Sequence, residues 1–291
     1  MEPDSLYDLA PLAWLLLVGV LIALGPLAWV WLRNRGAGAG RRLQALTVLT
    51  LFLTFDLVLF GAFTRLTDSG LGCPDWPGCY GNASPLGAHA EITAAQTAMP
   101  TGPVTHRKAW VEMVHRYLAT SVGFLILVIT VASWVEYSRS RAQRGAGAAV
   151  SAPVLSPWWP TVTLVWVCIQ GAFGALTVTM KLFPAIVTLH LVGGLVLLFL
   201  LCAQAVRRTQ IVQAVAPVPV PTAVRRWLWG ALVLLSIQVV LGGWVSTNYA
   251  VLACTEFPGC QGSLWPPMDF RQGFQVWRVL GVLQDGSYIS F

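Results

Sequence analysis

The chain alternates long apolar stretches with short polar connections. Each stretch is long enough to cross about 30 Å of hydrocarbon as a helix, because a helix rises about 1.5 Å per residue. The stretches cover residues 11–32, 43–63, 110–135, 158–179, 185–206 and 226–247. No basic segment precedes the first stretch, which is longer than the core of an ordinary signal peptide, so we expect it to be retained. The pattern predicts an all-α, polytopic membrane protein with about six transmembrane helices.

Arginine clusters occupy every second connection and predict the orientation of the chain. They follow the first and third stretches and flank the link after the fifth: Arg33, Arg35, Arg41, Arg42, Arg139, Arg141, Arg144, Arg207, Arg208, Arg225 and Arg226. The positive-inside rule places these connections in the cytoplasm. The N-terminus and the remaining connections then face outward. In a bacterial inner membrane this is the periplasmic side.

Composition agrees with a membrane protein and argues against other classes. Apolar residues make up 56% of the 291 positions and charged residues 10%, whereas soluble domains carry about 25% charge. The net charge of +6 comes from arginines in topological clusters, which does not indicate nucleic-acid binding. We therefore expect one membrane domain over residues 1–291, with the lipid bilayer as its surroundings.

A short pattern occurs twice, each time after a membrane-length stretch. The distance from Gly61 to Cys73 equals that from Gly242 to Cys254, and each cysteine has a partner six residues later. Gly81 and Gly262 close the two copies in register. So many matches in register indicate an internally duplicated membrane protein.

The cysteines of the two copies lie in outward loops, where disulfides form and persist. We expect Cys73 to pair with Cys79 and Cys254 with Cys260; pairing between loops and metal ligation are the alternatives, although neither loop copy supplies histidine. Each bond either staples its loop or exchanges with a thiol donor, since a small exposed ring is readily reduced.

Two histidines lie inside apolar stretches. His115 and His190 are each one to two turns from the same membrane face, and Gly193 and Gly194 allow close approach beside His190. Two imidazoles at equal depth on different helices are suited to binding haem iron as axial ligands. The alternative is that each histidine hydrogen-bonds a neighbouring helix.

The remaining histidines and cysteines carry no such signal. His89 and His106 fall in a polar outer loop and are interpreted as solvated, with His106 near enough to the third stretch to reach its rim. Cys168 and Cys202 lie within apolar stretches and are interpreted as inert small residues.

Glu112 precedes His115 by three residues and shares its helix face. A carboxylate beside an apolar cofactor could move protons during an oxidation. The alternative is a salt bridge to Arg116, Arg107 or Lys108. Arg65 and Arg116, at outer helix ends, could pair with haem propionates, although arginines at such positions commonly extend to the membrane surface.

At these residues the sequence resembles the haem A synthase family. The matching segments are residues 61–77, 110–116, 174–194, 242–248 and 265–270. The resemblance covers residue 43 to the end, and the extra helix at 11–32 resembles a variant of some proteobacterial members.

The resemblance implies a bundle of two four-helix halves, each with a bis-histidine haem site. His115 and His190 would hold the substrate haem O, a haem b cofactor would occupy the other site, and Glu112 matches the family's essential carboxylate. Cys73 and Cys79 match a pair implicated in haem transfer or reduction. The implied reaction oxidises a haem methyl group to the formyl group of haem A for terminal oxidases, with water as the oxygen source. Haem O synthase, an electron acceptor and a second copy of the chain are the implied partners.

The sequence departs from the family pattern at its C-terminal end. Residues 43–206 correspond to a first half with its haem site, and 226–291 to the start of a second half without its histidines. Residues 277–291 are expected to be outer loop, and the second haem site is expected to be incomplete in this chain. Three other interpretations stay open: a thiol–disulfide protein that reduces quinone, a bis-histidine cytochrome that only carries electrons, and an inactive truncated fragment.

Overall fold

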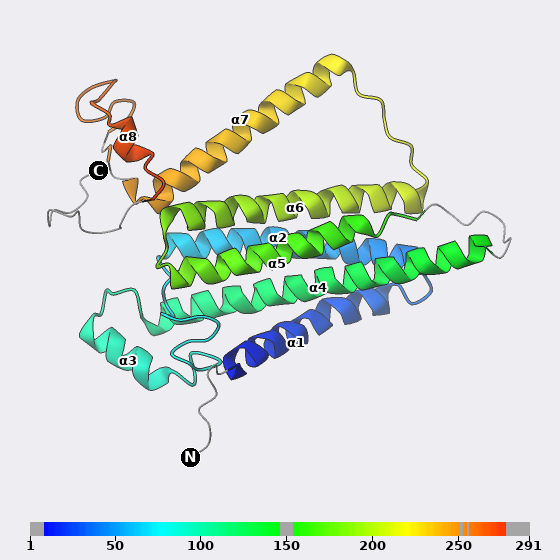
Figure 1. Cartoon of the computed structure of the whole chain (residues 1–291), viewed down its shortest axis with the longest axis horizontal. Helices are drawn as coiled ribbons and strands as arrows, with labels where there is room; N and C mark the ends of the chain where they lie inside the picture. The colour runs from blue at the N-terminus through cyan, green and yellow to red at the C-terminus, as the bar shows by residue number, and fades with distance from the viewer. Residues whose placement is uncertain (1–8, 146–153, 251–252, 255, 278–291) are drawn as a thin grey trace.

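The computed structural model describes residues 9–145, 154–250, 253–254 and 256–277, and most of these are helical (Figure 1). The predicted outer-loop segment beyond Trp277 lies outside the described residues. Six helices are long and apolar enough to cross a membrane: α1 (Ala10–Arg33), α2 (Ala39–Leu66), α4 (His106–Gly145), α5 (Trp158–Thr179), α6 (Pro184–Gln213) and α7 (Thr222–Thr247). The predicted fold class and all six predicted spans are confirmed.

Two short helices complete the described part of the chain, α3 (His89–Ala98) and α8 (Phe270–Gly273). Helix α3 was not predicted, because its segment was interpreted as outer loop. His89 begins α3 and His106 begins α4, with their ring centroids 4.6 Å apart, and Thr93 Oγ1 lies 2.9 Å from His106 Nε2. Both histidines thus begin helices instead of lying in a loop, while His89 is exposed, as the solvated interpretation predicts, and His106 is half-buried.

Helix α4 lies at the centre of the bundle. It packs against α1, α2 and α5, while α2 also packs against α6, and α5 pairs with α6. The α5–α6 link is a tight turn in which Lys181 and Leu182 take positive φ angles. Pro184 then starts α6 where a missing N–H has no consequence. This hairpin brings residues of α5 beside residues of α6.

Helix α7 diverges from the bundle (Figure 1). Apart from hydrogen bonds with Arg65 of α2 and Gly273 of α8, its packing contact within the described part of the chain is with α6. The contact lies at its C-terminal end, where Thr247 Oγ1 is 3.1 Å from Thr188 Oγ1 and Gly243 lies against Leu191. Most other α7 side chains are exposed.

Polar residues inside the helices satisfy their hydrogen bonds locally. Thr47, Thr50 and Thr54 are buried on α2, and each hydroxyl donates to the carbonyl four residues earlier. Such bonds remove the penalty of a free hydroxyl in an apolar interior. Helix α2 can therefore bury a polar stripe against its neighbours.

The two cysteine loops lie at the same end of the molecule (Figure 1). Several local contacts of the first loop recur in the second. Cys79 bridges Asn82, as Cys260 bridges Ser263. Asp75 accepts hydrogen bonds from backbone N–H groups of the first loop, as Glu256 accepts one from Gly262. Gly81 and Gly262 both take positive φ angles. The predicted duplication thus extends to backbone conformation and side-chain contacts.

Candidate functional site

His115 on α4 and His190 on α6 lie near the end of the bundle that carries the cysteine loops. Both lie beside the same part of α2: His115 packs against Gly61, and an added Cβ on Gly194, four residues after His190, would lie 3.9 Å from Val58 Cγ2. Both side chains are partly buried, and α2 packs against both of their helices. The structure therefore brings together two histidines that are 75 positions apart in the sequence, as counted from their numbers.

Each imidazole packs against a glycine of a neighbouring helix. A Cβ atom on Gly61 of α2 would lie 3.2 Å from His115 Cε1. A Cβ on Gly174 of α5 would lie 3.3 Å from His190 Cε1. Both distances are tighter than ordinary contacts, so the two glycines provide the space for the rings.

The two ring Nδ1 atoms differ in their partners. His115 Nδ1 is buried and has no hydrogen-bond partner among the described residues, while its ring stacks on Phe60 with centroids 6.1 Å apart. His190 Nδ1 lies 3.0 Å from Gln170 Nε2, and the same amide nitrogen donates to His190 O at 2.6 Å. The surroundings of the two histidines are unequal despite their similar packing on glycine.

This arrangement fits haem. Two imidazoles on different helices supply the donor atoms that a six-coordinate haem iron uses, and the surrounding helices are apolar. Glycine at positions 61 and 174 leaves beside each ring a space that a Cβ would fill. Among the described residues no group of three or more His, Cys, Asp or Glu side chains could hold a bare metal ion.

Glu112 connects the histidine helix to the first cysteine loop. Its Oε2 accepts a hydrogen bond from Cys73 N at 2.8 Å, and its Oε1 accepts one from Arg116 Nη2 at 2.5 Å. Glu112 and Arg116 are both buried. The expected alternative of a salt bridge to Arg116 is therefore present, and it includes a contact to the loop that was not expected.

Arg116 also contacts the cysteine loop. Its guanidinium donates to the carbonyl oxygens of Asp75, Pro77 and Gly78, the last at 2.6 Å. Its donors thus face the loop and Glu112. Lys108, another alternative partner for Glu112, pairs instead with Asp68 at 2.9 Å.

Arg65 joins the two copies of the repeat. Its Nη2 donates to Ser246 O at 2.5 Å, and its Cζ lies 4.4 Å from the centroid of the Tyr249 ring. The end of α2 is thereby attached to the end of α7. As placed, Arg65 and Arg116 both contact protein groups, and their pairing with propionates stays a prediction.

The cysteines pair as predicted, Cys73 with Cys79 and Cys254 with Cys260, with Cα–Cα distances of 4.9 and 4.7 Å. The expectation that both rings are exposed is wrong for the first. Cys73 and Cys79 are fully buried in a cluster that includes Leu15 of α1 and Met113 of α4. The first disulfide is covered because α1 packs over it.

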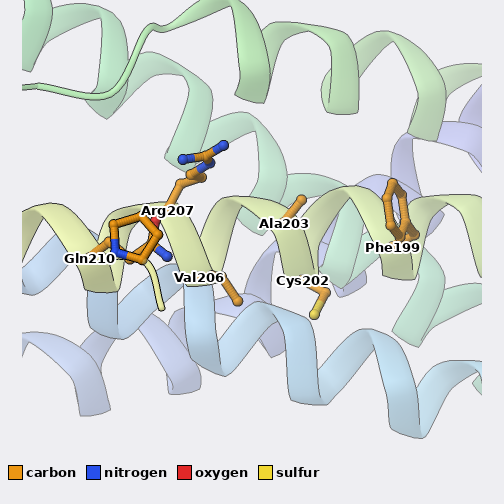
Figure 2. A pocket seen from close by; sticks show the side chains of 7 residues that line it. Phe199, Cys202, Ala203, Val206, Arg207 and Gln210 are labelled. Carbon is orange, nitrogen blue, oxygen red and sulfur yellow. The ribbon is translucent and has the colours of Figure 1, made fainter. Parts of the chain in front are cut away.

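The second ring is more open: Cys254 is exposed and Cys260 partly buried. Cys168 and Cys202 are free and exposed on their helices, and their interpretation as inert small residues stays a prediction. Cys202 lines a shallow hollow on α6 with Phe199, Val206, Arg207 and Gln210 (Figure 2). This hollow starts nine residues beyond His190, roughly 13 Å along the helix, so it is separate from the histidine site.

Sequence reasoning missed Gln170, Gly61 and Gly174. Gln170 is an amide inside an apolar stretch, and a polar group at that depth is a usable signal because it needs a partner. The glycines gave no signal by themselves, since their role depends on which ring faces them. Asp56, exposed on α2 within a span, was also overlooked.

Comparisons with known proteins agree with the expected family. The family model described as COX15-CtaA, cytochrome oxidase assembly protein, matches residues 44–283. A curated protein of Shewanella oneidensis named "Heme A synthase" is 39% identical over 235 residues, covering 79% of this chain and 64% of its own length. A protein of the same name from Symbiobacterium thermophilum is 27% identical, covering 83% of this chain and 71% of its own length.

This chain therefore spans slightly less than two thirds of the Shewanella protein. No solved structure matches the chain. The family model covers more than four fifths of the sequence, including both cysteine loops and both membrane histidines. The chain belongs to the COX15-CtaA family of cytochrome oxidase assembly proteins, which it shares with curated proteins named haem A synthase.

Proposed function

We propose that this protein takes part in haem A synthesis as an oxidoreductase of the bacterial inner membrane, with haem O as the substrate of the His115–His190 site. The observation that carries the proposal is the pair of imidazoles on α4 and α6, each packed on a glycine of an adjacent helix. Curated relatives named haem A synthase support the choice of substrate. A haem b cofactor would belong to the second half of the architecture.

The reaction converts a methyl group to a formyl group. Oxygen comes from water, and the change releases four electrons and four protons per methyl group. An electron acceptor is therefore required as a further partner. The iron, when bound by the two histidines, supplies the redox chemistry at the porphyrin.

The residues of this chain would bind and orient the porphyrin. His115 and His190 would fix it between α4 and α6, and the apolar walls of α2 and α5 would exclude water. Glu112 is one turn from His115 and carries a buried carboxylate. Its contacts to Cys73 N and Arg116 hold it at a fixed position, from which it could accept a proton released by the substrate.

The test is the product formed by Glu112 variants. We expect Glu112→Ala to lose conversion of haem O to haem A by at least about a hundredfold, the lower range for a general base, while keeping the optical spectrum of a six-coordinate haem. Glu91→Ala, which removes an exposed carboxylate on α3, is the matched control and should keep wild-type conversion.

Haem binding is measured separately from product. His115→Ala and His190→Ala should each abolish the six-coordinate spectrum in purified protein. Undiminished haem A formation by Glu112→Ala would refute the proton role. A six-coordinate spectrum that survives both histidine substitutions would refute the site itself.

A further inference from the structure

Gln170 of α5 is the polar side chain that lies against His190. Its Nε2 atom is 2.6 Å from His190 O and 3.0 Å from His190 Nδ1. A backbone carbonyl only accepts hydrogen bonds, so the atom that faces it at 2.6 Å must be the amide nitrogen and not the amide oxygen. The carbonyl therefore fixes the orientation of the Gln170 amide.

That orientation fixes the tautomer of His190. The amide nitrogen carries two N–H groups and no acceptor, so it can only donate to Nδ1. An Nδ1 that accepts a hydrogen bond carries no proton, and the proton of the neutral ring then lies on Nε2. A protonated Nε2 has no free lone pair for a metal ion.

His115 is under no such constraint. Its Nδ1 has no hydrogen-bond partner among the described residues, and its ring is held by stacking on Phe60 and by packing on Gly61. Stacking and packing do not select a tautomer. His115 can therefore present a bare Nε2 without breaking a hydrogen bond, whereas His190 cannot.

We propose that Gln170 is a positioning residue that weakens iron binding by His190, so that His115 is the permanent axial ligand and His190 the displaceable one. This inference rests on the proposed haem site. Iron binding by His190 Nε2 requires its proton to move to Nδ1 and the contact with Gln170 Nε2 to break. A substrate site needs such a ligand, because the product must leave it.

The neighbourhood of Gln170 holds the amide against His190. Trp166, one turn earlier on α5, donates from Nε1 to Gly193 O at 2.8 Å and fixes the register of α5 on α6. A Cβ on Gly193 would lie 2.2 Å from Gln170 Oε1. Only glycine at position 193 leaves room for the amide in its present position.

The first test uses the wild-type chain without haem. In protein labelled with 15N-histidine, we expect His190 to show a bare Nδ1 and a protonated Nε2, with the signal assigned by its loss in His190→Ala. The opposite tautomer at His190 would overturn the proposal. This result does not depend on whether the protein oxidises haem, so it is separable from the proposed function.

The second test measures how readily carbon monoxide displaces an axial ligand from the reduced haem-loaded protein. Gln170→Met removes the donor and keeps the side-chain size, and Gln170→Glu provides an acceptor for Nδ1–H. We expect carbon monoxide binding to slow by about tenfold in Gln170→Met, the factor for one hydrogen bond, and further in Gln170→Glu. If Gln170 instead strengthened iron binding by His190, carbon monoxide would bind faster to Gln170→Met than to the wild type, and the proposal would be overturned.

Glycine variants test the same proposal without changing Gln170 itself. Gly193→Ala should displace the amide and slow carbon monoxide binding as Gln170→Met does. Gly171→Ala is the control, because nothing lies within 4 Å of an added Cβ there. Equal rates in wild type, Gln170→Met and Gly193→Ala would overturn the proposal.

Discussion

At the scale of single residues, the histidine site depends on two glycines as much as on the two imidazoles, because a side chain at either glycine would occupy space next to a ring. Gly61 and Gly174 stand opposite the Cε1 atoms of the two rings, one on α2 and one on α5. Within a membrane, small residues let helices and side chains approach closely. The two rings are thus positioned by close packing against neighbouring helices, and within the described residues a hydrogen bond to a ring nitrogen occurs at His190 and not at His115.

Alanine at these glycines should therefore disturb the site without weakening the helices. Gly61→Ala and Gly174→Ala each add a methyl group 3.2–3.3 Å from an imidazole carbon, which must move by a few tenths of an ångström. Alanine favours a helix over glycine by roughly 0.5–1 kcal/mol, so thermal stability should be kept or raised. We expect a reduced six-coordinate haem spectrum in both variants.

Two other glycines are controls for this prediction. Gly123 on α4 and Gly171 on α5 have nothing within 4 Å of an added Cβ. Their alanine variants should keep the wild-type haem spectrum. If all four variants bind haem equally, the rings are not held by the glycines.

The sequence predicted the histidine pair but not what surrounds it. His115 and His190 were conspicuous because an ionisable group in an apolar stretch needs a partner. Glu112 was found in the same way, yet its contact to Cys73 N could not be, since that contact depends on how the loop folds back over α4. Gln170 contacts His190 only because the α5–α6 hairpin sets their register, which spacing alone does not give.

At the scale of helices, α1 covers the first cysteine loop. Leu15 of α1 packs in the cluster around Cys73 and Cys79, and Pro11 lies against Gly78. Helices α1 and α4 approach closely at Gly19, where an added Cβ would be 2.5 Å from Thr120 Cγ2. Access to the first disulfide is therefore controlled by the packing of α1 on α4.

Separating α1 from α4 should expose this disulfide. In the wild type we expect a water-soluble phosphine to reduce Cys254–Cys260 at least about tenfold faster than Cys73–Cys79, because only the second pair is exposed. Gly19→Leu should narrow this difference by accelerating reduction of the first pair. Alkylation followed by mass spectrometry of the loop peptides measures both rates.

Gly25→Leu is the control on the same helix, since nothing lies within 4 Å of an added Cβ there. It should leave both rates unchanged. Equal reduction of the two disulfides in the wild-type protein would show that α1 does not protect the first loop in the membrane.

The membrane spans were predictable from the sequence because length and apolar content alone identify them. The residues at which the helices begin and end were not. Helix α4 continues to Gly145, ten residues past its predicted end, through a segment rich in arginine with glutamate and glutamine, which favour helix without being apolar. Helix α3 was missed for a related reason: its ten residues are too polar and too few for a span. Ile92 packs this helix into the buried cluster around Cys73 and Cys79.

At the scale of the whole molecule, the two ends of the bundle differ in chemistry. One end carries both cysteine loops, α3 and the histidine site; the other carries the arginine-rich connections (Figure 1). At the arginine-rich end, Arg208 is buried between Ser133 at 2.5 Å and Glu136 at 3.4 Å, which links α6 to α4. This polarity favours a single orientation in the membrane.

Cysteine labelling in intact bacterial cells, with the outer membrane permeabilised, measures that orientation directly. In a background with Cys168→Ala and Cys202→Ala, Thr97→Cys places an exposed thiol on α3, and Ala142→Cys places one at the opposite end on α4. A maleimide that cannot cross the inner membrane should label Thr97→Cys and spare Ala142→Cys until the cells are lysed. The reverse pattern would place the cysteine loops in the cytoplasm, where reducing thiols would compete with both disulfides and where the proposed haem site would open to the wrong compartment.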